Sequence, residues 1–151
     1  LLPEMRRLPE ARVVLVSSLF GLVAPPGQSA YSASKFALRG FGEALRHELA
    51  GSSVGVTLVH PGGVATGIAR NARRAPGADP EEAAAAAAEF ERKHLKLAPE
   101  RAAETILEGV ARRAPRVLVG GDARALDLVQ RLAPGGYWAL AARLFGLERA
   151  R

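Results

Sequence analysis

The sequence predicts an α/β fold built on a parallel sheet, and three observations support this. Short apolar runs recur at 12–16, 54–59 and 116–121. They lack the alternation of a half-exposed strand, which is typical of parallel strands buried on both faces. Helical periodicity fills the intervals between them. Strands that alternate with helices in this way indicate a doubly wound arrangement.

The first strand–helix–strand unit is the best defined. The run 12–16 ends at two serines, and after a loop the segment 30–50 is predicted to be a helix. Its apolar residues at helical spacing are Phe36, Ala37, Phe41, Leu45 and Leu49. Gly51 ends this helix. A helix between neighbouring parallel strands forms a right-handed crossover.

Helices dominate the prediction for the rest of the chain. The alanine-rich segment 80–97 has strong helix propensity but little to bury. A helix is predicted over 99–113, and Asp122 is predicted to cap another that runs to Leu132. The last helix, "YWALAARLFGL", could pack on its own subunit or on a partner, or could dock on a membrane or a hydrophobic substrate.

Three strands make a thin sheet. Doubly wound sheets usually have about twice as many, and an apolar strand needs neighbours on both edges. We therefore expect the 151 residues to form the second half of a larger α/β domain.

Composition limits the possible functions. Hydrophobic residues make up 48% and charged residues 24%, the balance of a globular protein with a core. The absence of cysteine excludes disulfides and thiolate metal sites and favours a reducing, cytoplasmic compartment. No apolar run reaches the roughly 18 residues of a membrane span. The net charge of +6 comes from scattered arginines, so a nucleic-acid partner is not expected.

Three side chains with potential chemistry are predicted to meet at one edge of the sheet. Ser18 follows the carboxyl end of the first strand, and open α/β sheets bind ligands in the crevice outside these ends. Tyr31 and Lys35 are one helical turn apart, so they face the same side. The segment "PGGVAT", 61–66, follows the neighbouring strand. Ser17 could replace Ser18, and the tyrosine and lysine could be an ordinary surface pair.

These motifs resemble the short-chain dehydrogenase/reductase family. The resemblance rests on "VVLVSSLFG", "YSASK", "FGEALRHELA" and "VHPGGVATGI", which occur in the family's order and spacing. It covers residues 1 to about 68 and, less specifically, the region from 99 to 132. It implies the C-terminal half of a Rossmann-like doubly wound parallel sheet.

The resemblance also implies an NAD(P)-dependent oxidoreductase that interconverts an alcohol and a carbonyl. Tyr31 would be the general acid or base and would also contact the cofactor. Lys35 would support it and bind the nicotinamide ribose, and Ser18 would hold the substrate oxygen. A free phenol ionises near pH 10, and an adjacent ammonium favours the ionised form. The sequence does not distinguish NAD from NADP.

Further roles follow from the same resemblance. Pro61, Gly62, Val64 and Thr66 would line the nicotinamide, Val64 through its backbone and Thr66 through its hydroxyl. A metal site is not expected, because the three histidines lack the spacing of ligands.

Three regions complete the expected organisation. Residues 67–97 would form a substrate loop or lid, and 134–151 a helical tail. Their apolar character hints at a hydrophobic substrate. The 30–50 helix would pair subunits of a homo-oligomer.

One family motif is missing. The glycine-rich TGxxxGxG turn that binds the cofactor does not occur, and "GGVATG" has a different spacing and follows a different strand. We therefore expect the chain to be a fragment that does not bind a dinucleotide in the usual way. The alternative is a non-catalytic module that pairs with a full-length subunit.

Overall fold

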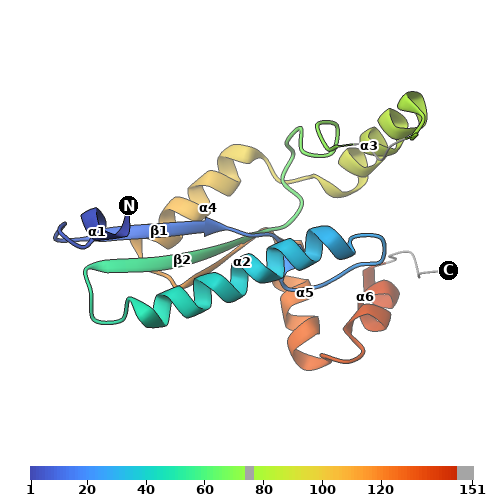
Figure 1. Ribbon diagram of the computed structural model, residues 1–151. Helices are drawn as coiled ribbons and strands as arrows, with labels where there is room; N and C mark the ends of the chain where they lie inside the picture. The colour runs from blue at the N-terminus through green and yellow to red at the C-terminus, as the bar shows by residue number, and fades with distance from the viewer. Residues whose placement is uncertain (74–76, 146–151) are drawn as a thin grey trace.

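A computed structural model describes residues 1–73 and 77–145, with side chains up to residue 143. In this part of the chain three parallel strands form one sheet in the order β1-β2-β3. The strands are β1 (Ala11–Val16), β2 (Val54–Pro61) and β3 (Arg116–Val119). The predicted fold class is confirmed, since the sheet is parallel and its strands are connected through helices (Figure 1).

Seven helical segments accompany the sheet in the described residues. They are α1 (Leu2–Met5), the 3-10 turn η1 (Leu19–Gly21), α2 (Ser29–Glu48), α3 (Pro80–His94), α4 (Pro99–Ala111), α5 (Gly121–Leu132) and α6 (Tyr137–Phe145). The helices α2 and α4 lie on opposite sides of the strands, and α3 extends away from the sheet (Figure 1).

The core lies on both faces of β2. Leu45 and Leu49 of α2 pack with Val54 and Val56 on one face. On the other face, Val59 packs with residues of α4 and β3. Burying these branched side chains contributes roughly 1.5–3 kcal/mol each, and this explains why β2 reads as a continuous apolar run.

The buried stripe of α2 differs from the predicted one. Phe36 and Phe41 are 39% and 58% exposed, whereas Ser32, Gly42 and Leu45 are buried. Gly42 permits the close approach, because a Cβ there would lie 2.7 Å from a methyl carbon of Leu58. Leu45 and Leu49 are buried as predicted, but Phe36 and Phe41 are not, because apolar residues occur on two sides of this helix.

Two predicted boundaries are also wrong. The helix expected over 80–97 ends at His94, because Leu97 forms a parallel bridge with Val64 instead. Asp122 is not the cap of α5: that position is Gly120, whose φ of 101° favours glycine. The carboxylate of Asp122 accepts a hydrogen bond from Gly63 N (2.7 Å).

The last helix packs on its own chain. Ala141 and Ala142 of α6 are buried, and α6 lies against α5. This agrees with one of the alternatives drawn from the sequence. The remainder of the predicted 134–151 tail, residues 146–151, lies outside the described residues.

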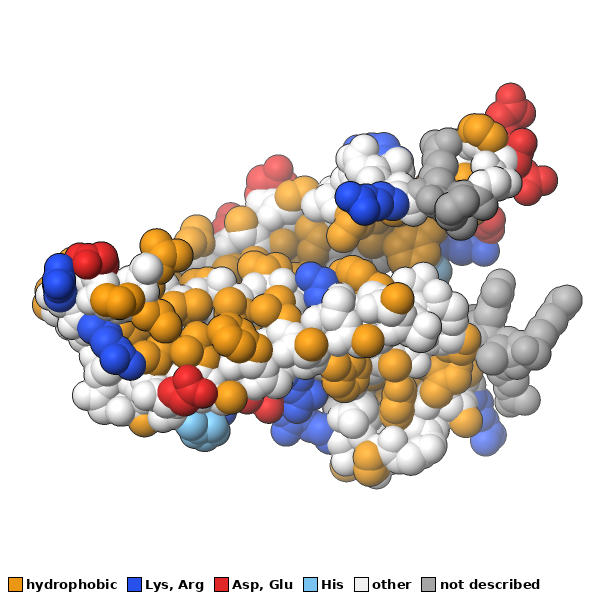
Figure 2. Space-filling view, in the orientation of Figure 1, with side chains coloured by type: hydrophobic (Ala, Val, Ile, Leu, Met, Phe, Trp, Pro, Cys, Tyr) orange, Lys and Arg blue, Asp and Glu red, His pale blue; other side chains and the backbone are white. Residues whose placement is uncertain are grey.

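One side of β1 is left uncovered. Val14 and Val16 are 37% and 51% exposed, and no described strand pairs with the outer edge of β1. Figure 2 shows hydrophobic side chains gathered over this region, between α4 and α2.

Candidate active site

Ser18 stands where β1 gives way to η1. Its backbone is extended, and its Oγ accepts a hydrogen bond from Phe20 N at 3.1 Å. A hydroxyl that accepts in this way keeps its own proton to donate elsewhere. The side chain is half-buried at the carboxyl end of the strand.

Ser17 has a different environment. It is buried, and its Oγ donates to the carbonyl oxygen of Lys35 at 3.0 Å. The Cβ of any residue replacing Gly21 would collide with this hydroxyl. Ser17 therefore anchors the first turns of α2 to the end of β1.

Tyr31 and Lys35 lie together in the first turns of α2, and both are half-buried. The Lys35 ammonium is 5.5 Å from the centroid of the Tyr31 ring. It also donates a long hydrogen bond, 3.4 Å, to the carbonyl oxygen of Val16. The ammonium is thus close to both the phenol and the end of β1.

Phe20 connects the serine to the tyrosine. Its backbone N–H holds the Ser18 hydroxyl, and its ring packs edge-on against the Tyr31 ring with centroids 6.0 Å apart. Sequence reasoning missed this residue. The apolar run "LFGLV" around it, which follows the two serines, is the sequence signal that could have pointed to it.

The predicted 61–66 loop is tightly held. Gly62 N donates to Val119 O at 2.9 Å, and Gly63 O accepts from Lys96 N and Leu97 N. A Cβ on Gly62 would collide with the carboxylate of Asp122. This part of the loop therefore requires glycine for close packing as well as for a turn.

Val64 and Thr66 lie beyond the two glycines. Val64 N donates to Gly62 O (3.0 Å), and Val64 O accepts from Thr66 N (2.8 Å). The backbone groups of Val64 are therefore engaged within the loop, although its carbonyl keeps a second lone pair. Thr66 is exposed.

His60 is buried beside the serine. It is 0% exposed, and its Nδ1 lies 3.0 Å from Ser18 O. Burial lowers the pKa of His60, and the nearby Arg116 and Arg39 lower it further, while the Ser18 hydrogen bond and Asp127 act in the opposite direction. The imidazole is therefore neutral at neutral pH.

The C-terminal helix supports the loop after Ser18. The hydroxyl of Tyr137 accepts a hydrogen bond from Ala24 N at 2.9 Å. Leu19 and Val23 are buried against Ala123 of α5 in the same cluster. The loop that precedes α2 therefore rests on residues more than 100 positions later in the chain.

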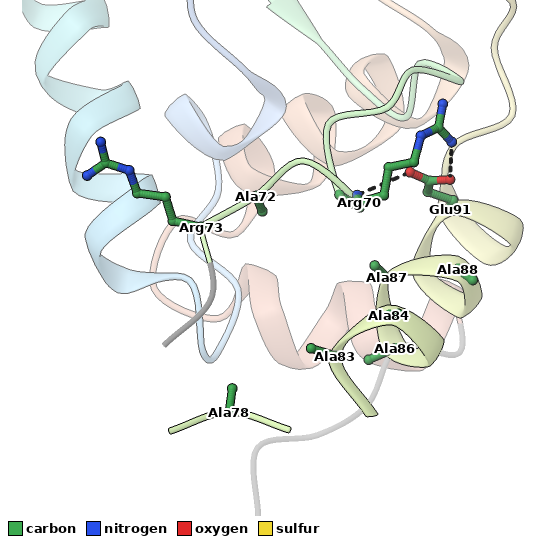
Figure 3. Close-up of a pocket in the computed structure, with 11 residues that line it drawn as sticks. Arg70, Ala72, Arg73, Ala78, Ala83, Ala84, Ala86, Ala87, Ala88 and Glu91 are labelled. Atoms are coloured by element: carbon green, nitrogen blue, oxygen red, sulfur yellow. Dashed lines mark hydrogen bonds and ion pairs between the residues drawn. The ribbon is translucent and has the colours of Figure 1, made fainter. Parts of the chain in front are cut away.

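A cavity of about 590 Å³ lies between α3 and the segment before it (Figure 3). Alanines of α3 form one side, and Arg70, Ala72 and Arg73 contribute to the other. Arg70 pairs with Glu91 of α3 at 2.9 Å. Neither Ser18 nor Tyr31 lines this cavity, so the cavity and the candidate catalytic residues are separate in this structure.

Within 1–73 and 77–145, no group of three or more His, Cys, Asp or Glu side chains could hold a metal ion. None of the helices in this part is long and apolar enough to cross a membrane.

Comparison with known proteins identifies relatives. A family model described as "short chain dehydrogenase" matches residues 1–77. "Putative oxidoreductase SadH" of Mycobacterium tuberculosis is 49% identical over 144 residues, which cover 93% of this chain and 51% of that protein. "Dehydrogenase/reductase SDR family protein 7-like" of Anopheles gambiae is 37% identical, with coverage of 94% and 44%. The chain spans about half the length of these relatives.

Solved structures give the same picture. A short chain dehydrogenase/reductase from Burkholderia phymatum in complex with NAD has a TM-score of 0.68 and 30% identity, covering 83% of this chain and 48% of that one. A short chain dehydrogenase from Burkholderia cenocepacia in complex with NADP has a TM-score of 0.66 and 26% identity, with coverage of 94% and 50%.

Proposed function

Because this chain belongs to the short-chain dehydrogenase/reductase family, we propose that it is the catalytic half of an NAD(P)-dependent oxidoreductase that interconverts an alcohol and a carbonyl. One observation carries the proposal. Phe20 holds the Ser18 hydroxyl by its N–H and the Tyr31 ring by its own ring, with the Lys35 ammonium 5.5 Å from that ring.

Ser18 and Tyr31 would share the work at the substrate oxygen. Ser18 accepts from Phe20 N, so its proton is available to a carbonyl oxygen as negative charge develops there. Tyr31 would deliver a proton to that oxygen during reduction and remove it during oxidation. Lys35 would stabilise the ionised phenol.

The residues present fit one end of a dinucleotide. Lys35 supplies a cation beside the Tyr31 ring, and Gly62 and Gly63 place no side chain on the loop that follows β2. We propose that the nicotinamide end is held by Tyr31, Lys35, Pro61, Gly62, Val64 and Thr66. A bound nicotinamide would supply or accept the hydride. NAD and NADP are equally compatible, as the two structural relatives illustrate.

We further propose that 67–97 forms the substrate lid and that the substrate is hydrophobic. The alanine-rich composition of residues 67–97 supports an apolar substrate. The cytoplasm is the proposed location, supported by the absence of cysteine.

The chain alone should not bind a dinucleotide, because its sequence has no glycine-rich phosphate turn. Isothermal calorimetry with NAD and with NADP would measure this directly. Tight binding of either by the isolated chain would contradict the assignment of this chain to the catalytic half alone.

The decisive test uses a fusion of this chain to the part of the Mycobacterium tuberculosis relative that it does not match. Tyr31→Phe should lower turnover on the order of 10²–10⁴-fold and leave cofactor binding largely intact. The matched control is Tyr137→Phe, which removes the bond to Ala24 N and keeps the chemistry. Substantial turnover by the Tyr31→Phe fusion would refute the proposal.

A second candidate is a non-catalytic module that pairs with a full-length subunit through α2. The exposed rings of Phe36 and Phe41 favour it, and the same surface would pair subunits of a homo-oligomer. Substituting both phenylalanines by lysine should convert a dimeric fusion to a monomer in light scattering, whereas Leu107→Lys on α4 should not. Pairing without any turnover by the fusion would favour the module.

A further inference from the structure

His60 makes one polar contact that packing does not require. Its Nδ1 lies 3.0 Å from Ser18 O, and a carbonyl oxygen only accepts hydrogen bonds, so Nδ1 carries the proton. Nε2 is then an acceptor, and it is buried with no hydrogen-bond partner in the described residues. Leaving a buried acceptor without a partner is destabilising. An apolar side chain would avoid that cost, so a functional reason for this imidazole has to be sought in the Ser18 contact.

The contact lies just beyond the end of a strand ladder. The pairing of β1 with β2 ends at Val16 and Val59, and Ser17 N still donates to Val59 O at 2.8 Å. Ser18 leaves the strand and begins η1, and within that turn its carbonyl oxygen accepts from Gly21 N at 3.0 Å. The His60 side chain supplies a second hydrogen bond to the same oxygen, and this one comes from the neighbouring strand β2.

We propose that His60 is a positioning residue that fixes the backbone of Ser18, and therefore the direction of its hydroxyl. The proposal rests on the proposed function of Ser18. The hydroxyl is held on one side by Phe20 N, and the carbonyl of the same residue is held by His60. Without His60, only the local turn bond from Gly21 N would hold this carbonyl, so the peptide could tilt and the hydroxyl would move away from the substrate oxygen.

The charged groups around the imidazole agree with a neutral donor. Arg116 of β3 and Arg39 of α2 disfavour a second proton, and Asp127 of α5 only partly offsets them. Asp127 is itself occupied by Arg116 and Arg131. A protonated ring would place a second donor, at Nε2, where no acceptor is described.

Three substitutions of His60 distinguish the effect of its hydrogen-bond donor from the effect of its packing volume. In His60→Asn the amide nitrogen takes roughly the place of Nδ1, whereas in His60→Gln it takes that of Nε2. His60→Leu has no donor. The matched control is Thr57→Val: Thr57 lies on the same strand, is equally buried, and donates to Ala114 O at 2.9 Å, away from Ser18.

The first measurement is steady-state kinetics of the fusion. His60→Gln and His60→Leu should lower kcat by about 10–100-fold, since a shift of about 1 Å can cost 10²-fold, with the cofactor KM unchanged. His60→Asn should recover most of kcat, and Thr57→Val should leave it within about threefold. Equal kcat values for the Asn and Gln variants, or an equal loss in Thr57→Val, would overturn the positioning role. If His60→Leu does not fold, the Asn–Gln pair decides.

The second measurement does not depend on activity. Nitrogen NMR of the imidazole in the chain should show the Nδ1–H tautomer at neutral pH, and His60→Gln should shift the amide signals of 18–20 more than Thr57→Val does. An Nε2–H tautomer, or shifts confined to β2, would refute the proposed hydrogen bond from His60 to the Ser18 carbonyl, which we call the tether. If Tyr31→Phe stays active while the tautomer is as expected, the proposed chemistry fails and the tether stands.

Discussion

The two outer strands, β1 and β3, form edges of the sheet that differ in length, burial and charge. β3 has four residues, its valines 117 and 119 are buried, and a groove of about 340 Å³ beside it is lined by Arg112, Arg116 and Arg124. β1 has six residues, and its exposed side chains are Val14 and Val16. Natural edge strands are short and charged, which prevents unwanted pairing. By this criterion β3 has the features of a natural edge strand and β1 does not.

This difference between the two edges indicates that β1, unlike β3, needs further residues to cover it. The relatives are about twice as long, and we expect a further strand and its helices on the β1 side. Ser18 follows β1 directly, so the candidate active site stands at the join between the closed and the open part of the sheet. The following predictions test that division, from the largest expected effect to the smallest.

A charge introduced on β2 should destabilise the fold far more than a charge introduced on β1. Val16 and Val59 are cross-strand neighbours, 51% and 0% exposed. Val59→Asp should cost more than about 4 kcal/mol and prevent folding, because it buries an unpaired charge. Val16→Asp should change stability by less than about 1 kcal/mol. Guanidinium chloride unfolding measures both. Similar losses would mean that β1 is already covered.

The open edge should also cause self-association of the isolated chain. We expect sedimentation to show concentration-dependent oligomers, because unpaired strand groups and exposed valines invite pairing. Val14→Lys with Val16→Lys should weaken this association by about tenfold or more. Leu128→Lys, which changes an exposed leucine on α5, is the control. A chain that remains monomeric at high concentration would contradict the open edge.

The face of β1 toward α2 should behave as closed. A Cβ on Gly42 would lie 2.7 Å from Leu58 and 2.8 Å from Leu15 carbons, whereas nothing lies within 4 Å of one on Gly40. Gly42→Ala should therefore cost roughly 1–3 kcal/mol, and Gly40→Ala should stabilise by up to about 1 kcal/mol. Thermal unfolding of the two variants decides. A stabilising Gly42→Ala would show that this face, too, is loosely packed.

The smallest expected effect is a pH dependence of stability caused by His60, which lies beside Ser18. Burial lowers the pKa of His60 below its ordinary value of about 6.5. The unfolded chain then binds more protons than the folded chain between the two values, so stability falls as the pH drops below about 6.5 toward the folded pKa. Unfolding midpoints between pH 7.5 and 5 should show this slope in Thr57→Val and lose it in His60→Asn. A slope that survives in His60→Asn would assign it to other groups.

The sequence predicted those parts of the molecule that depend on local pattern. The strands, the crossover and the convergence of Ser18 with Tyr31 and Lys35 follow from apolar runs and from spacing. The buried side of α2 was predicted only in part: Leu45 and Leu49 are buried, whereas Phe36 and Phe41 are exposed although they too are apolar. Only the packing of Gly42 against β2 reveals which side is buried.

Long-range contacts account for the rest of what sequence could not reveal. The carboxylate of Asp122 holds Gly63 N, 59 residues away. His60 holds Ser18 O across 42 residues. Neither leaves a periodic signal, because each depends on two strands ending at the same level of the sheet. A histidine before proline and an aspartate after two glycines look ordinary until the sheet is assembled.

The bond between Tyr137 and Ala24 spans 113 residues, and this has a consequence for folding order. During synthesis Ser18 and Tyr31 emerge from the ribosome long before α6 does. Their loop can reach its final arrangement only when the last helix docks, and contacts so distant in sequence form slowly. The candidate active site is therefore completed only after α6 has been synthesised and has docked, and truncation within α6 would leave its loop without this support.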